Sequence, residues 1–293
     1  MNAWASAGAS SPLRGLWRSA PASFKVGLAL LLGHVVVAAL GPFVAPFGPA
    51  EIGTGVPLSG MSLTHPMGVD QIGRDVFSRV LYGAHIVIIL SLAGTALGLA
   101  VGSIVGLLSA YVGGLFDEVV QRVIEAFVSI PYLVLGLLAV YAAGPELAGH
   151  PALMVLVIGI VYAPRIARMA RAAALDIVTR DYVTVARLRG ESAWSVIRRD
   201  LAPNAASTLL VEFALRTGYA PALIGAFGFL GFGVQPPTPE WGLMISENRN
   251  LILVSPVTVL GPGLTLASLV VAVNLTAEGL ARIFGRSIDF SVR

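Results

Sequence analysis

The chain has 293 residues, of which 56% are hydrophobic and only 12% are charged, with a net charge of +3 and a mean hydropathy of +0.83. Because soluble domains usually carry about 25% charged residues, this composition indicates an integral membrane protein. The absence of cysteine excludes a disulfide framework, a thiolate zinc site and a cysteine nucleophile. The basic residues lie in loops beside apolar segments, which indicates membrane topology and not nucleic-acid binding.

The amino-terminal part is expected to be a cytoplasmic tail over residues 1–23, followed by a first transmembrane helix over 24–47. A cleaved signal peptide is the rival interpretation, but its apolar core would be about 7–15 residues long, and this segment is longer. Residues 48–83 contain no apolar run long enough to cross a bilayer. The range 24–83 is therefore interpreted as one transmembrane helix with a periplasmic segment.

Residues 84–293 are expected to form a core of five further helices. The second span covers about 85–110, and in it glycine recurs every fourth residue, at Gly94, Gly98, Gly102 and Gly106. Four glycines in register on one helical stripe would allow another helix to approach closely. The alternative is that glycine is simply common in membrane helices.

The remaining spans are expected at 119–142, 153–174, 207–232 and 257–281, with an extramembrane loop over 233–255. The fold class is therefore an all-α integral membrane protein with six transmembrane helices. An even number of spans puts both termini on one side. Most of the basic residues, including the arginines between 165 and 199, fall on that side, so the positive-inside rule makes both termini cytoplasmic.

A charged stretch over 181–204 interrupts the apolar sequence and is expected to be a helix–Gly–helix hairpin, with Gly190 as the break. Pro203 is expected to limit the second helix. The hairpin could lie passively in the membrane interface or could bind a partner protein, and spacing alone leaves both open. Apolar side chains recur at helical spacing on both sides of the break: Tyr182, Val185, Ala186 and Leu188 before it, and Trp194, Ile197 and Leu201 after it.

This stretch resembles the cytoplasmic loop of ABC importer permeases, whose peptide-transporting branch reads close to E-Y-V-E-A-A-R-x-x-G-x-S-x-x-x-I-x-x-H-x-L-P-N. The chain departs from that pattern at Thr184 and Val185, where Glu-Ala is usual, and at Asp200, where His is usual. The resemblance implies a coupling helix within a loop over 175–205 that docks on an ATPase subunit. The residues that would form this contact are Tyr182, Val185, Ala186, Arg187, Gly190, Ser192, Ile197 and Pro203.

Other motifs occur in the same order as in the C-type subunit of the dipeptide/oligopeptide/nickel permease family. His65 to Asp75 reads HPMGVDQIGRD, and Phe229 to Gly242 reads FLGFGVQPPTPEWG. The similarity implies a type I ABC importer permease core in a bacterial inner membrane. It also implies four further partners, namely a homologous B-type permease, two ATP-binding subunits and a periplasmic solute-binding protein. The residues expected to contact that binding protein are Asp70, Arg74, Gln235 and Trp241.

The fifth span carries two charges, Glu212 and Arg216, at a spacing of i, i+4. Opposite charges at this spacing can pair on one helix face, and charges inside a membrane usually face a cavity or a partner. We expect them to line or brace the translocation pathway. The alternative is a neutralised pair near the cytoplasmic boundary.

The sequence offers no basis for catalysis by this chain. The four histidines lack metal-binding spacing, there is no G-x-x-x-x-G-K-[ST] phosphate loop, and the only lysine is Lys25. Asp70, Arg74 and Asp75 are interpreted as a capped turn with local ion pairs. No metal or cofactor is expected in the chain, and ATP and Mg would be bound by partner subunits.

Two other classes stay open. A stand-alone secondary transporter or channel would need internal repeats and its own ion site, and an intramembrane enzyme would need a convergent polar cluster at depth. For an importer the cargo would be di- or oligopeptides, although relatives also carry nickel complexes, opines and glutathione.

Overall fold

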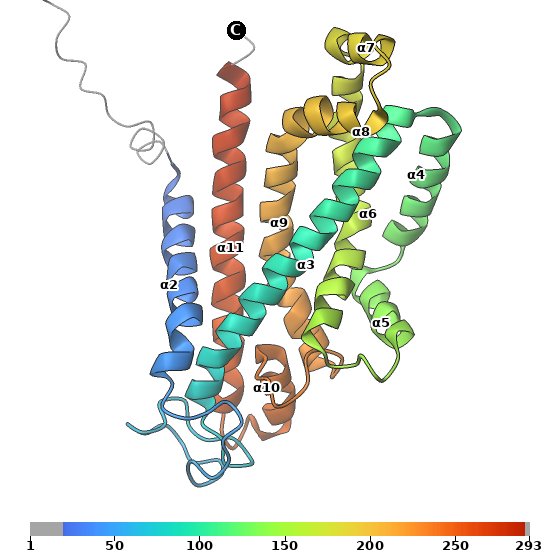
Figure 1. The fold of residues 1–293 in the computed structure, drawn as a ribbon. Coiled ribbons are helices and arrows are strands. Elements are labelled where there is room, and N and C mark those ends of the chain that lie inside the picture. The colour runs from blue at the N-terminus through green and yellow to red at the C-terminus, as the bar shows by residue number, and fades with distance from the viewer. Residues whose placement is uncertain (1–19, 291–293) are drawn as a thin grey trace, which may run out of the picture.

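The computed structural model describes the backbone of residues 20–290 and the side chains of residues 20–282 (Figure 1). The tail expected over residues 1–23 therefore falls almost entirely outside the described residues. Within them the regular structure is helical apart from one isolated β-bridge between Val69 and Asp75. The elements are α2 (Ala22–Val44), α3 (Val76–Val112), α4 (Gly114–Ser129), α5 (Tyr132–Ala143), α6 (Pro151–Val178), α7 (Asp181–Leu188), α8 (Ala193–Val196), the π-helical η1 (Ile197–Leu201), α9 (Ala202–Phe229), α10 (Trp241–Asn248), the 3-10 turn η2 (Arg249–Leu251) and α11 (Val257–Phe290).

The long helices α2, α6, α9 and α11 run roughly along one direction, and α3 crosses the bundle obliquely (Figure 1). The helices α7 and α8 lie at one end of this bundle, and α10 lies at the other end with the connection between α2 and α3. The start of α2 and the end of α11 are at the same end as α7. The two ends of the bundle are therefore built from different parts of the chain.

Four of the described helices are long and apolar enough to cross a membrane: α2, α3, α6 and the Val257–Arg282 part of α11. The bent pair α4 and α5 raises this number to five if the pair counts as one span. The helix α9, which carries Glu212 and Arg216, is not among them. The structure thus bears out a mostly helical chain with four to five apolar helices, which is less than the six spans expected from the sequence.

The helix α3 begins at Val76, within the segment 48–83 that is expected to lie outside the membrane. The Asp75 side chain caps it by accepting a hydrogen bond from the Ser78 backbone N–H at 2.7 Å. Val76 and Val80 are buried in a cluster with Trp241 of α10. Capping and this packing against a distant segment therefore begin the helix before residue 85, where the second span is expected to start.

The expected third span is not a straight helix. The chain breaks at Pro131, and α4 and α5 meet at an angle of 98°. Proline has no backbone N–H and disfavours a helical conformation in the residue before it, and Ile130 is accordingly extended, with φ −79° and ψ 130°. The span expected over 119–142, with Pro131 inside it, is therefore bent at that proline.

The glycine stripe of α3 packs against α6. A Cβ atom on Gly102 would lie 2.6 Å from the Ala163 carbonyl oxygen, and one on Gly106 would collide with the carbonyl oxygen of Ala167. The two backbones are thus too close for a side chain, which confirms the prediction that the stripe mediates helix packing.

Candidate functional site

The hairpin between α6 and α9 has the predicted helix–Gly–helix form, with Gly190 at φ +74° between α7 and α8. The Gly190 N–H donates to the Arg187 carbonyl, and the Glu191 N–H donates to the Ala186 carbonyl. This pair of bonds ends α7 in a Schellman motif, which requires the left-handed conformation that glycine adopts readily. The Ser192 side chain then caps α8 by accepting from the Ser195 N–H.

The two sides of α7 have opposite environments. Val183 and Ala186 are buried in a cluster with residues of α3 and α6. Leu188 is 82% exposed, and Tyr182 and Val185 are exposed on the same side. Of the apolar face expected from the sequence, Tyr182, Val185 and Leu188 are therefore exposed, whereas Ala186 is buried.

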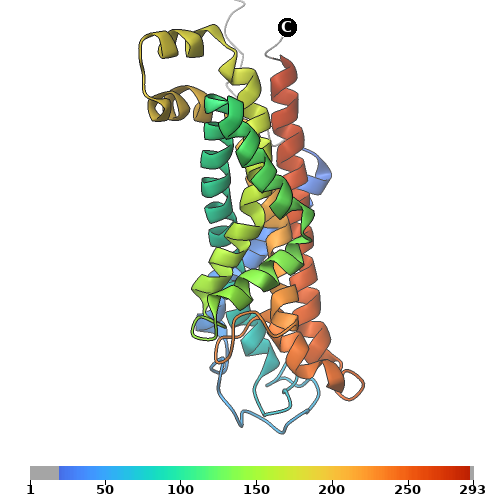
Figure 2. The same ribbon diagram turned by 90° about the vertical axis from the view of Figure 1, so that its right-hand side faces the viewer.

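The second apolar face of the hairpin is divided. Ile197 and Leu201 are buried, whereas Trp194 is 58% exposed. Figure 2 shows the hairpin projecting sideways from the end of the bundle. We call the exposed apolar side chains Tyr182, Val185, Leu188 and Trp194 the hairpin surface.

Pro203 does not limit the second helix, and that prediction is wrong. The chain continues from α8 through η1 into α9, with Pro203 in the first turn of α9. The Ala202 N–H bonds to the carbonyl of Ile197, five residues earlier. This wider π turn alters the hydrogen-bond ladder where proline has no N–H to contribute.

Arg187 attaches the hairpin to the end of α3. Its Nη2 donates to the Tyr111 carbonyl oxygen at 2.7 Å, and the guanidinium lies 4.4 Å from the centre of the Tyr111 ring. Among the residues expected to contact a partner, Ala186 and Ile197 are buried, and the exposed Arg187 binds Tyr111. Tyr182 and Val185 remain available for contact.

At the opposite end of the bundle, buried charges of the α2–α3 connection and of Arg79 pair with the partly buried Glu247 of α10. Asp70 Oδ2 accepts from Arg74 Nε at 2.6 Å and from Arg79 Nη1 at 2.9 Å. Glu247 Oε2 lies 2.8 Å from Arg74 Nη2 and 2.9 Å from Arg79 Nη1. His65 Nδ1 lies 2.9 Å from Asp75 Oδ1. The expected turn with local ion pairs is present, and Glu247 extends it across elements.

The residues expected to touch a binding protein at this end are mostly internal. Asp70 and Trp241 are fully buried, and Arg74 is 7% exposed. Trp241 Nε1 donates to the Val80 carbonyl oxygen at 3.0 Å. Of the four, Gln235 alone is only half-buried. A contact role for Asp70, Arg74 and Trp241 stays a prediction; in this structure their side chains hold the segment together.

Sequence reasoning missed the surface that these buried residues support. Large apolar side chains that are strongly exposed at this end include Val56, Met61, Leu63, Leu253 and Val254. Apolar residues inside otherwise polar loops are the signal that could have identified them.

Glu240 is a further residue that the sequence analysis did not single out. Its carboxyl oxygens accept from the backbone N–H groups of Gly242 and Leu243, both at 2.8 Å, and so cap α10. The residue is completely buried. This burial raises the pKa of Glu240 from 4.5 to about 7, against the opposing effect of the two backbone hydrogen bonds.

The predicted pairing of Glu212 and Arg216 is confirmed. Arg216 Nε and Nη2 lie 2.7 and 2.6 Å from Glu212 Oε1. Arg216 lies halfway along α9, roughly 21 Å from the first residue of that helix at 1.5 Å per residue. The pair therefore belongs to the middle of the bundle and not to the end of a helix.

A cavity of about 590 Å³ lies beside this pair, where α4 and α5 are broken; we call it the arginine cavity. The sequence predicts that Arg165 belongs to the arginines of the hairpin region, but Arg165 lies halfway along α6. Its guanidinium is 5.8 Å from the centre of the Tyr132 ring. The polar residues that line the cavity are Tyr132, Tyr162, Arg165, Arg216 and Tyr219.

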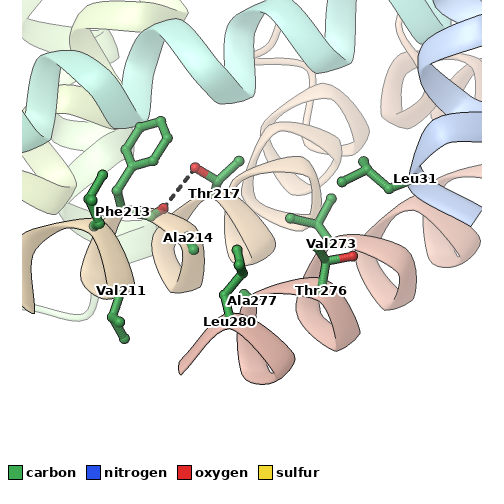
Figure 3. A pocket seen from close by; sticks show the side chains of 10 residues that line it. Leu31, Val211, Phe213, Ala214, Thr217, Val273, Thr276, Ala277 and Leu280 are labelled. Carbon is green, nitrogen blue, oxygen red and sulfur yellow. Dashed lines mark hydrogen bonds between the residues drawn. The ribbon is translucent and has the colours of Figure 1, made fainter. Parts of the chain in front are cut away.

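A second cavity, of about 360 Å³, lies between α9 and α11 with Leu31 of α2 at its edge (Figure 3). It has no charged side chain in its lining. Thr217 donates to the Phe213 carbonyl oxygen and Thr276 to that of Ala272, so both hydroxyl groups are satisfied within their helices. This cavity therefore offers apolar contact only. Within the residues whose side chains are described, no group of three His, Asp or Glu side chains could hold a metal ion.

The comparisons with known proteins all point to membrane components of transport systems. Residues 94–290 match the family described as binding-protein-dependent transport system inner membrane component. The dipeptide transport system permease protein DppC of Haemophilus influenzae is 34% identical over 261 residues, which cover 87% of each chain. The di/tripeptide transport system permease protein DppC of Pseudomonas aeruginosa is 34% identical over 92% of this chain and 90% of its own. The glutathione transport system permease protein GsiD of Pectobacterium atrosepticum is 32% identical over 75% of this chain and 72% of its own.

Proposed function

Because the chain belongs to the family of binding-protein-dependent transport system inner membrane components and is a transmembrane permease of an ABC importer, we propose how its parts serve that task. The hairpin surface docks on an ATPase subunit at the cytoplasmic face. The helices form half of a translocation pathway whose other half is a second permease subunit. Closure of the ATPases moves the hairpin, and the hairpin moves the helices that hold it.

The observation that carries this proposal is the division of the hairpin into a buried side and an exposed apolar side. Val183 and Ala186 join the hairpin to the cluster between α3 and α6, while Leu188 is 82% exposed. Exposed apolar side chains on a firmly held element are typical of a protein contact. A force applied there would pass into two long helices.

We further propose six spans, with α9 and the α4–α5 pair among them and both termini in the cytoplasm. Charges within α9 are compatible with this because Arg216 is paired with Glu212 and faces a cavity. The complex is that of a bacterial inner membrane. Its other members are a B-type permease, two ATP-binding subunits that hold ATP and Mg, and a periplasmic solute-binding protein. This chain itself is not catalytic.

The proposed cargo is a small peptide. The relatives named above are described as permeases for dipeptides, di- and tripeptides and glutathione, which share a peptide backbone and a free carboxylate. The solute-binding protein would meet the end of the bundle formed by the α2–α3 connection and α10.

The coupling role can be tested at Gly190. Proline fixes φ near −65°, whereas Gly190 has φ +74°, so Gly190→Pro should distort the hairpin and abolish peptide-stimulated ATP hydrolysis in the reconstituted complex. Gly190→Asn is the matched control, because asparagine tolerates positive φ and a side chain here meets open space. It should retain coupling.

A second variant separates docking from distortion. Leu188→Ser alters an exposed side chain, so it should leave the chain folded but weaken its recovery with the ATPase subunits after mild-detergent purification. Normal transport by both Gly190→Pro and Leu188→Ser would overturn the coupling assignment. Recovery of the chain alone, active in liposomes without ATP, would favour a stand-alone secondary transporter or channel.

A further inference from the structure

Two guanidinium groups line the arginine cavity, Arg165 from the middle of α6 and Arg216 from the middle of α9. Arg216 is neutralised by Glu212 at 2.6 Å. Arg165 differs from Arg216 because it forms no ion pair or hydrogen bond with the described residues. Its guanidinium carbon lies over the Tyr132 ring, 5.8 Å from the ring centre. One positive charge at this depth is therefore without an anion.

Such a charge is unfavourable unless something compensates for it. Charged side chains within membrane segments are rare, and they usually mark a substrate path or a paired partner. A cation–π contact contributes only about 0.5–2 kcal/mol, which is small beside the preference of a guanidinium for a carboxylate at low dielectric constant. The surroundings of Arg165 therefore favour an anionic ligand.

The cavity has the size and lining of a site for a small amphipathic molecule. Its volume of about 590 Å³ falls within the range of roughly 300–1,000 Å³ found for small-ligand sites. Tyr162 and Tyr219 add hydroxyl groups beside the two arginines. Leu133 and Leu223 provide an apolar wall. One end of the ligand would be charged and the rest would contact hydrocarbon.

We propose that Arg165 binds the terminal carboxylate of the transported peptide during passage through the arginine cavity. This inference rests on the proposed function and specifies the part of the cargo that this chain recognises. A guanidinium can hold a carboxylate through two parallel hydrogen bonds. The terminal carboxylate is common to all unmodified peptides, so this contact selects for a peptide end without reading its sequence. Because Glu212 neutralises Arg216, Arg165 is the cation of the cavity that is left to bind the carboxylate.

The test uses the purified complex of this chain with its companion subunits, in the absence of the solute-binding protein. The probe is the tripeptide Ala-benzoylphenylalanine-Ala, compared with the same peptide carrying a terminal carboxamide. After irradiation, mass spectrometry locates and quantifies the crosslinks. For the wild type, the free acid should crosslink to residues of the cavity such as Leu223, and the amide should do so about tenfold less, as expected for loss of a charge-assisted hydrogen bond.

Three variants give the comparison its specificity. Arg165→Gln should reduce crosslinking of the free acid to the level of the amide and leave the amide unchanged. Arg165→Lys, which keeps the charge but loses the planar fork, should fall between the two. Arg168→Gln lies on the same helix but is exposed and outside the cavity lining, so it should behave as wild type.

Each other outcome overturns the inference. Equal crosslinking of acid and amide in the wild type, or an unchanged acid signal in Arg165→Gln, would show that Arg165 does not read the carboxylate. Failure of Arg165→Gln to assemble would make Arg165 a partner of an acidic residue in another subunit. A phospholipid lost from the variant without any change in peptide crosslinking would make the cavity a lipid site. Rejection of the proposed function gives a different result from rejection of this inference. If the function were wrong, the complete wild-type complex would show no peptide-stimulated ATP hydrolysis.

Discussion

The carboxyl group of Glu240 is the clearest example of how position in the fold alters one residue. It is completely buried at the start of α10, and its pKa is raised to about 7 by that burial. The native state therefore binds this proton more tightly than the unfolded chain does. The contribution of Glu240 to stability is present in full below about pH 4.5 and is lost as the pH rises through 7.

We expect the apparent Tm of the detergent-solubilised wild type to fall as the pH rises from 5 to 8. In Glu240→Gln this fall should be smaller. One pKa unit corresponds to about 1.4 kcal/mol, so the contribution is on the order of a few kcal/mol. Glu146→Gln is the control, because Glu146 is exposed and its removal should leave the pH dependence unchanged. An identical pH profile for wild type and Glu240→Gln would contradict this account.

Gly106 of α3 and Gly33 of α2 allow the close packing of helices to be tested at single residues. A Cβ on Gly106 would collide with the backbone of α6, whereas a Cβ on Gly33 of α2 would meet nothing within 4 Å. We expect Gly106→Ala to destabilise the protein by about 1–3 kcal/mol, as overpacking does, and to lower the Tm. Gly33→Ala should be neutral or stabilise by up to about 1 kcal/mol through helix propensity. Equal Tm changes for the two variants would show that α3 and α6 can separate without cost.

At the scale of elements, α4 is held to the bundle by little apolar contact. Ile124 is its one buried residue. Its other attachment is polar: Arg171 of α6 donates from Nε and Nη2 to the two oxygens of Asp117 at 2.6 and 2.5 Å. The Ser109 hydroxyl also donates to Asp117. This ion pair therefore positions α4 against α3 and α6.

We expect Asp117→Ala to loosen α4 without unfolding the bundle. Hydrogen bonds to charged groups contribute about 1.5–3 kcal/mol, so amide hydrogen exchange within residues 114–129 should accelerate at least about tenfold. The neighbouring Glu118→Ala removes an exposed carboxylate and should leave the exchange rates unchanged. Uniform acceleration over the whole chain in Asp117→Ala would mean that the pair stabilises the entire fold and not α4 alone.

At the scale of the whole molecule, the two ends of the bundle are proposed to face opposite sides of the membrane. Leu63 is fully exposed at the end that contains the α2–α3 connection, and Leu188 is largely exposed at the end that contains the hairpin. Since the chain has no cysteine, either leucine can be replaced by a single reactive thiol. These two positions are a matched pair for testing topology.

We expect Leu63→Cys to react with a membrane-impermeant maleimide in cells whose inner membrane is intact. Leu188→Cys should react only after that membrane is permeabilised, because the hairpin is proposed to be cytoplasmic. Labelling of both positions from the same side would rule out the six-span arrangement.

The sequence by itself determined the features that depend on composition and on local spacing. The apolar composition established a membrane protein. The glycine stripe of α3, the break at Gly190 and the pairing of Glu212 with Arg216 were each predicted correctly. All of these arise from residues a few positions apart, where helix geometry alone fixes which side chains share a face.

The tertiary structure decided the features that depend on contacts between distant segments. Trp241 is buried against α3, where its ring N–H donates to the Val80 carbonyl oxygen, 161 residues away. Asp70 is buried in ion pairs with Arg74 and Arg79. The angle between α4 and α5 and the position of Arg165 beside Tyr132 likewise follow from how the helices pack. Periodicity identifies the faces of a helix, but only the assembled bundle determines which face is covered, because burial is a property of the neighbours and not of the segment.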